Sequence, residues 1–332
     1  MRYKQTILFI ALSILTFVFF IADMTIGNVH IPLRDIINTF TGDHSSFITS
    51  EILLNFRLPK AITAVLTGAA LAVSGLMMQT LFRNPLADPY ILGVSSGASL
   101  GVALTIMTSS FLPLVSTTNG WTLILSATVG ATLVLMLVIG VSFKVRNAVS
   151  LLIVGIMFGM IASSLVNVLQ NFSNPDSIKL FVMWTFGSLS AVTWEYMKVL
   201  FPVVFIGITI AFAIHKRLDG LLLGENYARS LGIPITATRV LIVIATGLLA
   251  GGVTAFVGPI AFVGIAIPHI ARGIFKTASH GTLLPACILS GASLLLACDL
   301  VSQIPAHSLP INTVSALFGA PIIIWIILKR KS

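Results

Sequence analysis

Residues 61–82 of the chain read AITAVLTGAALAVSGLMMQTLF, a stretch of 22 residues without a charged side chain. An α-helix needs about 20 apolar residues to cross the hydrocarbon core of a membrane. Comparable stretches recur along the whole chain, which is 57% hydrophobic and only 9% charged, with a mean hydropathy of +1.05. Because soluble globular proteins carry about 25% charged residues, the sequence predicts an all-α, polytopic membrane protein. A membrane β-barrel would show short alternating strands instead.

These apolar stretches predict about ten membrane-spanning helices. They cover residues 6–27, 61–82, 90–109, 121–142, 149–170, 194–214, 236–256, 258–275, 283–301 and 311–328. Residues 247–275 are open to two interpretations, either two spans or one span with a re-entrant piece, and Gly258-Pro259 is the natural place for a reversal. The longest outer segments, 28–60 and 171–193, are too short to fold alone. We therefore expect residues 1–332 to form a single transmembrane domain.

Lysines and arginines set the expected orientation, because they concentrate in the inner loops of membrane proteins. Five of the 19 fall on the outer side of the ten-span arrangement and the remaining 14 on the inner side; the outer five are Arg34, Arg57, Lys60, Lys179 and Lys198. We therefore expect both termini in the cytoplasm. The first apolar stretch lacks a small-residue cleavage site, so we interpret it as a retained helix rather than a signal peptide. The net charge of +9 lies at the ends of spans, which argues against a nucleic-acid partner.

The sequence lacks the motifs of nucleotide hydrolysis and of common hydrolases. It contains no G-x-x-x-x-G-K-[ST] phosphate loop, no H-E-x-x-H zinc motif and no G-x-S-x-G nucleophile elbow. We therefore expect a transport subunit that is not an enzyme and binds no metal or cofactor of its own. An intramembrane enzyme is the weakest alternative, because catalytic pairs are missing.

Charged residues inside the predicted spans are scarce, with Asp23 and Asp299 near outer ends. A carrier driven by an ion gradient usually places several charges at mid-membrane, so a stand-alone secondary carrier is the weaker interpretation. The energy for transport is expected from a partner. Cys287 and Cys298 lie on one face of a single predicted helix, which favours packing over a disulfide or a metal pair.

The stretch LLLGENYARSLGIP, residues 221–234, is a polar segment between two apolar spans and predicts one short amphipathic helix. Glu225 and Arg229 are spaced to pair across one turn, while Gly232 is placed to cap the helix and Pro234 to stop it. The apolar face consists of four residues: Leu223, Tyr227, Ala228 and Leu231. Such a face is a poor lipid anchor and is better suited to the groove of a protein partner.

Five stretches resemble the permease subunits of binding-protein-dependent ABC importers for iron siderophores, haem and vitamin B12, the FecCD-type permeases. In chain order they are RLPKAITAVLTGAALAVSGLMMQTLFRNPLADPYILGVSSGASLG, MWTFGSLS, LLLGENYARSLGI, GPIAFVGIAIPHIAR and LPINTVSALFGAPIIIWIIL. The resemblance implies the type II importer architecture with ten spans per subunit and a dimer around a central pathway. It also implies two cytoplasmic ATPase subunits that use ATP and Mg, and an extracytoplasmic binding protein.

The resemblance also implies roles for individual residues. It identifies residues 221–234 as the cytoplasmic coupling helix that inserts into the ATPase, through Gly224, Glu225, Tyr227, Ala228, Arg229, Leu231 and Gly232. It identifies FRNPLAD, residues 82–88, as part of a cytoplasmic gate formed by Asn84, Pro85 and Leu86. Irregular backbone between Pro85 and Pro89 is tolerated where it lines a protein cavity, although a simple tight loop stays open as an alternative.

At the outer face, Arg57 and Lys60 match basic positions that pair with glutamates of the binding protein. The chain departs from the family at two places, with Lys60 where arginine is common and Gln303 where many members carry an arginine after the ninth-span aspartate. Docking is therefore expected to use fewer or different charges, with His307 as a further candidate. Exposed ion pairs of this kind are worth only about 0–1 kcal/mol each, but together they orient an acidic partner.

The expected function is that of the membrane-spanning permease of a bacterial ABC importer in the cell (inner) membrane. Cargo is expected to move by alternating access, driven by ATP hydrolysis on the partner subunits. An iron chelate, siderophore or haem, is the first expectation for the cargo and cobalamin (vitamin B12) is the second. The second permease subunit is expected to be another copy of this chain, and a heterodimer stays open.

Overall fold

The computed structural model describes residues 2–27, 29–41, 46–108, 120–145, 148–304 and 308–329, and every regular element within these ranges is a helix. The first half contains α1 (Arg2–Thr25), α2 (Leu33–Thr41), α3 (Phe47–Ile52), η1 (Leu53–Arg57), α4 (Leu58–Leu81), η2 (Pro89–Leu92), α5 (Val94–Thr108), α6 (Gly120–Ser142) and α7 (Ala148–Asn171). The second half contains α8 (Pro175–Thr185), η3 (Leu189–Ala191), α9 (Trp194–Ala213), α10 (His215–Leu222), α11 (Glu225–Ser230), α12 (Ile235–Thr246), η4 (Gly247–Gly251), α13 (Gly252–Val257), α14 (Val263–Phe275), α15 (His280–Ser302) and α16 (Ile311–Lys329). The docking candidate His307 and the inner basic residues Arg146, Arg330 and Lys331 lie outside the described residues.

The helices confirm the polytopic, all-α prediction. Within the described residues, seven continuous helices are long and apolar enough to cross a membrane. The remaining predicted spans correspond to three shorter apolar helices, 94–108, 263–275 and 311–324. The chain reverses at Gly258, whose φ of +78° a glycine adopts without strain. The ambiguous region 247–275 is therefore two helices, the continuous segment α12–η4–α13 and the short α14.

The helix predicted to begin at residue 61 begins at Phe47 instead, because α3, η1 and α4 are continuous over 35 residues. Pro59 lies inside this helix, where its missing N–H would normally break the ladder of hydrogen bonds. The π-helical turn η1 directly before it has already interrupted that ladder. The helix can thus pass through the proline, and the sequence-based start at residue 61 is wrong.

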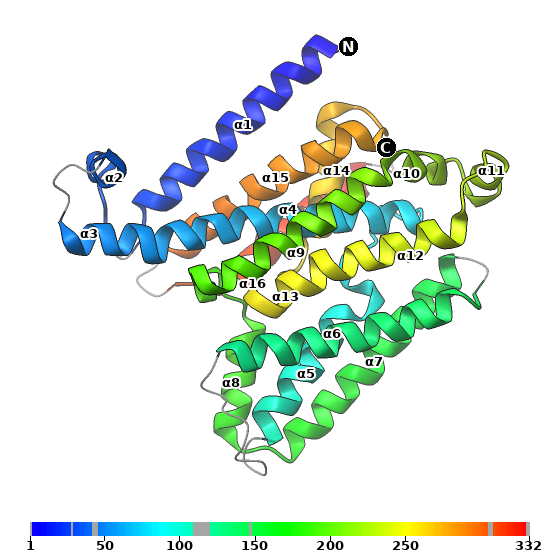
Figure 1. The fold of residues 1–332 in the computed structure, drawn as a ribbon, viewed down its shortest axis with the longest axis horizontal. Helices are drawn as coiled ribbons and strands as arrows, with labels where there is room; N and C mark the ends of the chain where they lie inside the picture. The colour runs from blue at the N-terminus through cyan, green and yellow to red at the C-terminus, as the bar shows by residue number, and fades with distance from the viewer. Residues whose placement is uncertain are drawn as a thin grey trace.

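Helix α4 runs through the middle of the bundle and packs against α9, α12, α14 and α15 (Figure 1). Its contacts with α14 and α15 are backbone to backbone. A Cβ added at Gly75 would overlap the main chain of Gly264 in α14, and one at Gly68 would overlap the main chain of Gly291 in α15. Small residues that let backbones approach closely are typical of helix packing in membranes.

A second group of helices, α5 to α8, lies beside the first group (Figure 1). Here Gly97 of α5 faces Gly130 of α6, and Gly155 and Gly159 of α7 contact the segment around Gly93. Glycines therefore let the helix backbones of this group approach one another closely.

The bundle has two ends, which are formed by different elements (Figure 1). One end, which we call the α11 end, carries the start of α1, α10, α11 and the connection from α6 to α7. The opposite end, which we call the α2 end, carries α2, α3, the start of α4 and α8. The predicted inner cations that belong to described helices are carried by helix ends at the α11 end (Figure 1). Four outer cations are carried by elements at the α2 end: Arg34 by α2, Lys60 by the start of α4, Lys179 by α8 and Lys198 by the start of α9.

Candidate functional site

The short helix predicted for residues 221–234 is present as α11 but is shorter than expected, because Leu221 and Leu222 end α10 and only Glu225–Ser230 form α11. Glycines flank α11 on both sides. Gly224 precedes it with a φ of +104°, and Gly232 follows it with a φ of +79°. The N–H of Gly232 donates to the carbonyl of Arg229 at 3.0 Å, and the N–H of Ile233 donates to that of Ala228 at 3.0 Å. This pair of bonds is a Schellman motif, in which a glycine satisfies the last carbonyls of a helix. The prediction that Gly232 caps the helix is confirmed.

Helix α11 turns its small residue inward and its large apolar residues outward. Ala228 is fully buried, whereas Leu223, Tyr227 and Leu231 are 62%, 54% and 57% exposed. Tyr227 and Leu231 are one turn apart, on α11 and at its C-cap, whereas Leu223 lies before Gly224, at the end of α10. We call these three exposed side chains the stripe of α11. An exposed apolar stripe on a helix at the end of the bundle is a surface that a partner can cover.

Glu225 pairs with Arg239 of α12 rather than with Arg229, which the i,i+4 spacing suggested. The guanidinium Nη2 of Arg239 lies 2.5 Å from both carboxylate oxygens of Glu225. Arg239 is buried, and its Nη1 also donates to the carbonyl of Val145 between α6 and α7 at 3.3 Å. Bidentate, charge-assisted pairs are among the stronger polar contacts. They fix α11 to α12 and to the α6–α7 connection.

The segment 82–88 leaves the end of α4 as an ordered turn. Arg83 has a φ of +50°, which is uncommon for a residue with a side chain. The Asn84 side chain accepts a hydrogen bond from the N–H of Leu86 at 3.0 Å, and its backbone N–H donates to the carbonyl of Gln79 at 3.1 Å. Leu86 is 43% exposed. The segment follows the end of α4 that lies toward α10 and α12 (Figure 1). The three gate candidates, Asn84, Pro85 and Leu86, are thus adjacent, and their role in gating stays a prediction.

Two contacts connect this segment with its surroundings. A Cβ at Gly224 would lie 3.6 Å from Nη1 of Arg83, so the start of α11 lies beside the end of α4. After the turn, Asp88 accepts a hydrogen bond from the N–H of Tyr90 at 2.7 Å. Burial of its carboxyl raises the pKa of Asp88 to about 6. The coupling and gate candidates are therefore neighbours, which their separation in sequence did not indicate.

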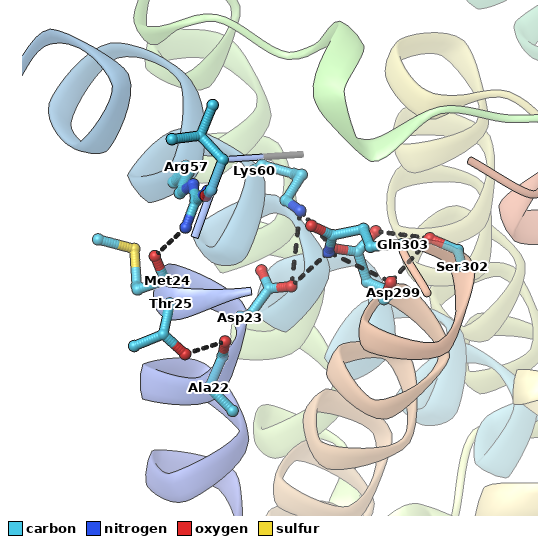
Figure 2. A network of polar contacts seen from close by, with 10 residues as sticks. Ala22, Asp23, Met24, Thr25, Arg57, Lys60, Asp299, Ser302 and Gln303 are labelled. Carbon is cyan, nitrogen blue, oxygen red and sulfur yellow. Dashed lines mark hydrogen bonds and ion pairs between the residues drawn. The ribbon is translucent and has the colours of Figure 1, made fainter. Parts of the chain in front are cut away.

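At the α2 end, α1, α4 and α15 are joined by a buried polar network (Figure 2). Lys60 Nζ lies 2.7 Å from Asp299 Oδ2 and 3.5 Å from Asp23 Oδ1. The amide Nε2 of Gln303 donates to Asp23 Oδ1 at 2.9 Å and to Asp299 Oδ2 at 2.8 Å. Arg57 donates to the carbonyl of Met24 at 2.6 Å and also to that of Val29. The sequence placed both aspartates near the outer ends of spans but did not show that they share one lysine.

The docking candidates Arg57, Lys60 and Gln303 therefore use their polar groups inside the chain. Arg57 and Lys60 are each only 7% exposed. They border a cavity of about 570 Å³ that opens between the start of α4, the α8–α9 connection and the α15–α16 connection. Docking of a binding protein through these three residues stays a prediction, and it requires this network to open or the partner to reach into the cavity.

Helix α7 carries an unusual polar face for a membrane span. Ser163, Ser164 and Asn167 are exposed on it, and they border a hollow of about 390 Å³ together with Ser96 of α5 and Tyr90 of η2. Polar groups in a span are costly against lipid and mark water-filled cavities or partner contacts. Sequence reasoning missed this face because single serines and asparagines do not interrupt an apolar stretch.

Known proteins resemble this chain over nearly its whole length. Residues 14–329 match the model of the FecCD transport family. The vitamin B12 import system permease protein BtuC of Salmonella typhi is 37% identical over 291 residues, which cover 87% of each chain. The BtuC of Klebsiella pneumoniae subsp. pneumoniae is 34% identical over 278 residues, which cover 83% of this chain and 82% of that protein.

A solved structure supports the same assignment. The inward-facing conformation of a metal-chelate type ABC transporter superposes with a TM-score of 0.86 at 29% sequence identity, over 97% of this chain and 99% of that one. The ordered motifs, the helical fold and the near-complete coverage agree with one another. The chain therefore belongs to the FecCD transport family and is an ABC importer permease of that family.

Proposed function

We propose that the chain is the permease of a vitamin B12 importer. The supporting observation is the 37% identity over 87% of both chains with a protein named as a vitamin B12 import permease. This reverses the order expected from the sequence, in which an iron chelate came first. An iron chelate is the second candidate, and the structural neighbour described as a metal-chelate type transporter favours keeping it.

In the proposed assembly, two copies of the chain enclose the pathway. The polar face of α7 supports this arrangement, because Ser163, Ser164 and Asn167 would then face water or passing cargo instead of lipid. The wall that they form carries hydroxyl and amide groups and no charge. Such a wall suits a bulky cargo that has to slide past without being bound tightly.

The α11 end is the cytoplasmic end in this proposal. The positive-inside rule favours this orientation, since the inner cations of the described helices gather there. Two ATPase subunits bind the stripe of Leu223, Tyr227 and Leu231, and they bind and hydrolyse ATP with Mg. The permease itself does no covalent chemistry. Closure of the ATPases moves α11, and the helices around the dimer axis then change between outward and inward openings.

The α2 end faces an extracytoplasmic binding protein that delivers the cargo. The cavity beside Lys60, Asp299 and Gln303 opens on this side and offers a concave surface for that partner. Helices α2 and α3 lie at the same end (Figure 1).

Transport by the purified complex tests the proposal. Liposomes containing the permease and its ATPase subunits are supplied with the partner binding protein and with labelled cyanocobalamin, a ferric siderophore or haem. We expect ATP-dependent uptake of cyanocobalamin. Uptake of only an iron chelate would replace the first candidate by the second. Uptake driven by a proton gradient in liposomes that contain this chain alone would overturn the ABC mechanism.

A further inference from the structure

Three side chains from three helices form a chain of hydrogen bonds at the α11 end, in which the Asp219 side chain is 37% exposed and the other two are buried. His280 Nδ1 donates to Asp219 Oδ1 at 2.7 Å, and His280 Nε2 is hydrogen-bonded to the hydroxyl of Thr80 at 2.8 Å. His280 is 1% exposed and Thr80 is fully buried. Asp219 belongs to α10, His280 to α15 and Thr80 to α4. Both ring nitrogens of a buried histidine are therefore used to join α10 to α4.

Asp219 is also the N-terminal cap of α15, although it comes from a different helix. The backbone N–H of His280 donates to Asp219 Oδ1 at 2.7 Å, and Ser279 at the usual cap position makes no side-chain capping bond. A carboxylate at this place satisfies an otherwise unpaired N–H and lies at the positive end of the helix dipole. The position of α10 is thus fixed relative to α15 by a backbone bond and by a side-chain bond.

Helices α10 and α11 are connected to each other by backbone hydrogen bonds and by packing. The N–H of Gly224 donates to the carbonyl of Leu221 at 3.0 Å, and the N–H of Ala228 donates to that of Gly224 at 2.8 Å. A Cβ at Gly220 would overlap the side chain of Ile233, which follows the cap of α11. Any displacement of α11 by a partner therefore displaces Asp219.

At the other end of the chain of bonds, Thr80 lies in the last turn of α4. The adjacent Gln79 accepts a hydrogen bond from Arg272 of α14 at 2.5 Å, and its carbonyl accepts the N–H of Asn84 at 3.1 Å. Leu81 ends the helix, and the irregular segment with Leu86 begins directly after it. A shift of Thr80 is passed along the backbone to the gate candidates.

We propose that Asp219, His280 and Thr80 form the joint through which the movement of α11 reaches segment 82–88, with His280 as a positioning residue. This inference rests on the proposed function, since it assumes that ATPase subunits move α11. The joint transmits force because its central side chain, His280, is buried and has one partner at each ring nitrogen. Displacing Asp219 or Thr80 without the other groups leaves one of these buried ring nitrogens unpaired. Such a group costs more than the bond contributes.

Thiol reactivity at the gate measures this transmission. Both native cysteines, Cys287 and Cys298, are buried, so Leu86→Cys introduces a single accessible thiol. In the complete complex with its ATPase subunits, we expect the rate of modification of this thiol by a water-soluble maleimide to change on addition of ATP and Mg. In a Thr80→Val background, that nucleotide-dependent change should shrink by about fivefold, the equivalent of one lost buried hydrogen bond.

Matched variants separate transmission from general damage. Thr80→Ser keeps the hydroxyl and should restore the response. Thr67→Val is the control, because Thr67 is a fully buried threonine on the same helix whose hydroxyl has no hydrogen-bond partner among the described residues. If the Thr80→Val complex does not assemble, His280→Asn takes its place, since asparagine can reach Asp219 but not Thr80.

The outcomes are distinguishable. A response that is lost in Thr80→Val or His280→Asn and kept in Thr80→Ser and Thr67→Val supports the joint. An undiminished response in Thr80→Val or His280→Asn, or an equal loss in Thr67→Val, overturns it and leaves the proposed function standing. If the background with Leu86→Cys alone shows no effect of ATP and Mg, the ATP-driven mechanism is overturned and the joint with it.

Discussion

Lys60 is the only lysine or arginine in the described part of the chain that is ion-paired with the buried aspartates Asp23 and Asp299. Replacing it by methionine keeps most of the side-chain volume and removes the charge. The two carboxylates then keep only the Gln303 amide in common. One oxygen of Asp23 already lacks a hydrogen-bond partner among the described residues. We therefore expect Lys60→Met to destabilise the α2 end of the bundle strongly.

The size of the effect follows from the distances. At an effective dielectric constant of about 20, unit charges 2.7 Å apart, the separation of Lys60 Nζ and Asp299 Oδ2, attract by about 6 kcal/mol. The desolvation of the ammonium group offsets much of this attraction. Removing one member of a buried pair nevertheless costs about 3–5 kcal/mol, because an uncompensated charge remains. With about 2 °C per kcal/mol for a chain of this size, the Tm should fall by about 6–10 °C.

Thermal unfolding of the purified permease in detergent measures this effect. Lys198→Met is the matched control, because Lys198 lies at the same end but is exposed. The triple variant Asp23→Asn, Lys60→Met, Asp299→Asn removes all three charges and should regain most of the lost Tm. A Lys60→Met protein that melts within about 2 °C of the unmodified chain, against the shift expected for a buried pair, would refute the reasoning. A triple variant as unstable as the single one would also refute it.

Three further predictions concern the α11 end. Glu225→Gln should weaken the anchoring of α11 by about 1.5–3 kcal/mol and lower cargo-stimulated ATP hydrolysis, while membrane insertion stays intact. The exchange Glu225→Arg with Arg239→Glu should recover part of the ATP hydrolysis. No recovery would mean that this pair does not hold α11. Gly232→Ala should lower the stability of the α11 cap by about 1 kcal/mol, because φ is +79° while nothing lies within 4 Å of the added Cβ. It should lower coupled ATP hydrolysis less than Gly232→Val does. Equal ATPase activities of the two variants would contradict this. The folded state holds the proton of Asp88 more tightly than the unfolded state, so stability falls as the pH rises from 3.8 to about 6. Asp88→Asn should reduce the dependence of the Tm on pH in this window. An unchanged slope of Tm against pH would exclude Asp88 as its source.

The sequence was sufficient to predict the spans, because each depends on a local property, the apolar length of one stretch. A short helix within 221–234 and its glycine cap were also local, as Gly232 and Pro234 signal the end of a helix wherever it packs. Its start at Glu225 was not predicted, because Leu221 and Leu222 continue α10. The start of α4 was missed because a π-helical turn changes how Pro59 is tolerated, and no simple pattern marks such a turn.

Polar partners were harder to predict because they depend on how distant helices meet. Spacing alone suggested Arg229 for Glu225, but the folded chain brings Arg239 closer. The burial of Lys60 depends on Asp23 and Asp299, which come from opposite ends of the sequence. The roles of the coupling, gate and docking residues came from family resemblance, and the geometry shows which of them are neighbours without testing what they do.

The glycine contacts of α4 have a mechanical consequence. A helix interface made of side chains can adapt by changing rotamers, whereas one made of touching backbones has nothing to rearrange. Around Gly68 and Gly75, helices α4, α14 and α15 meet in this second way. We expect these three helices to keep their register throughout a transport cycle and to move as one rigid body. Bending should be confined to the irregular segments at its ends.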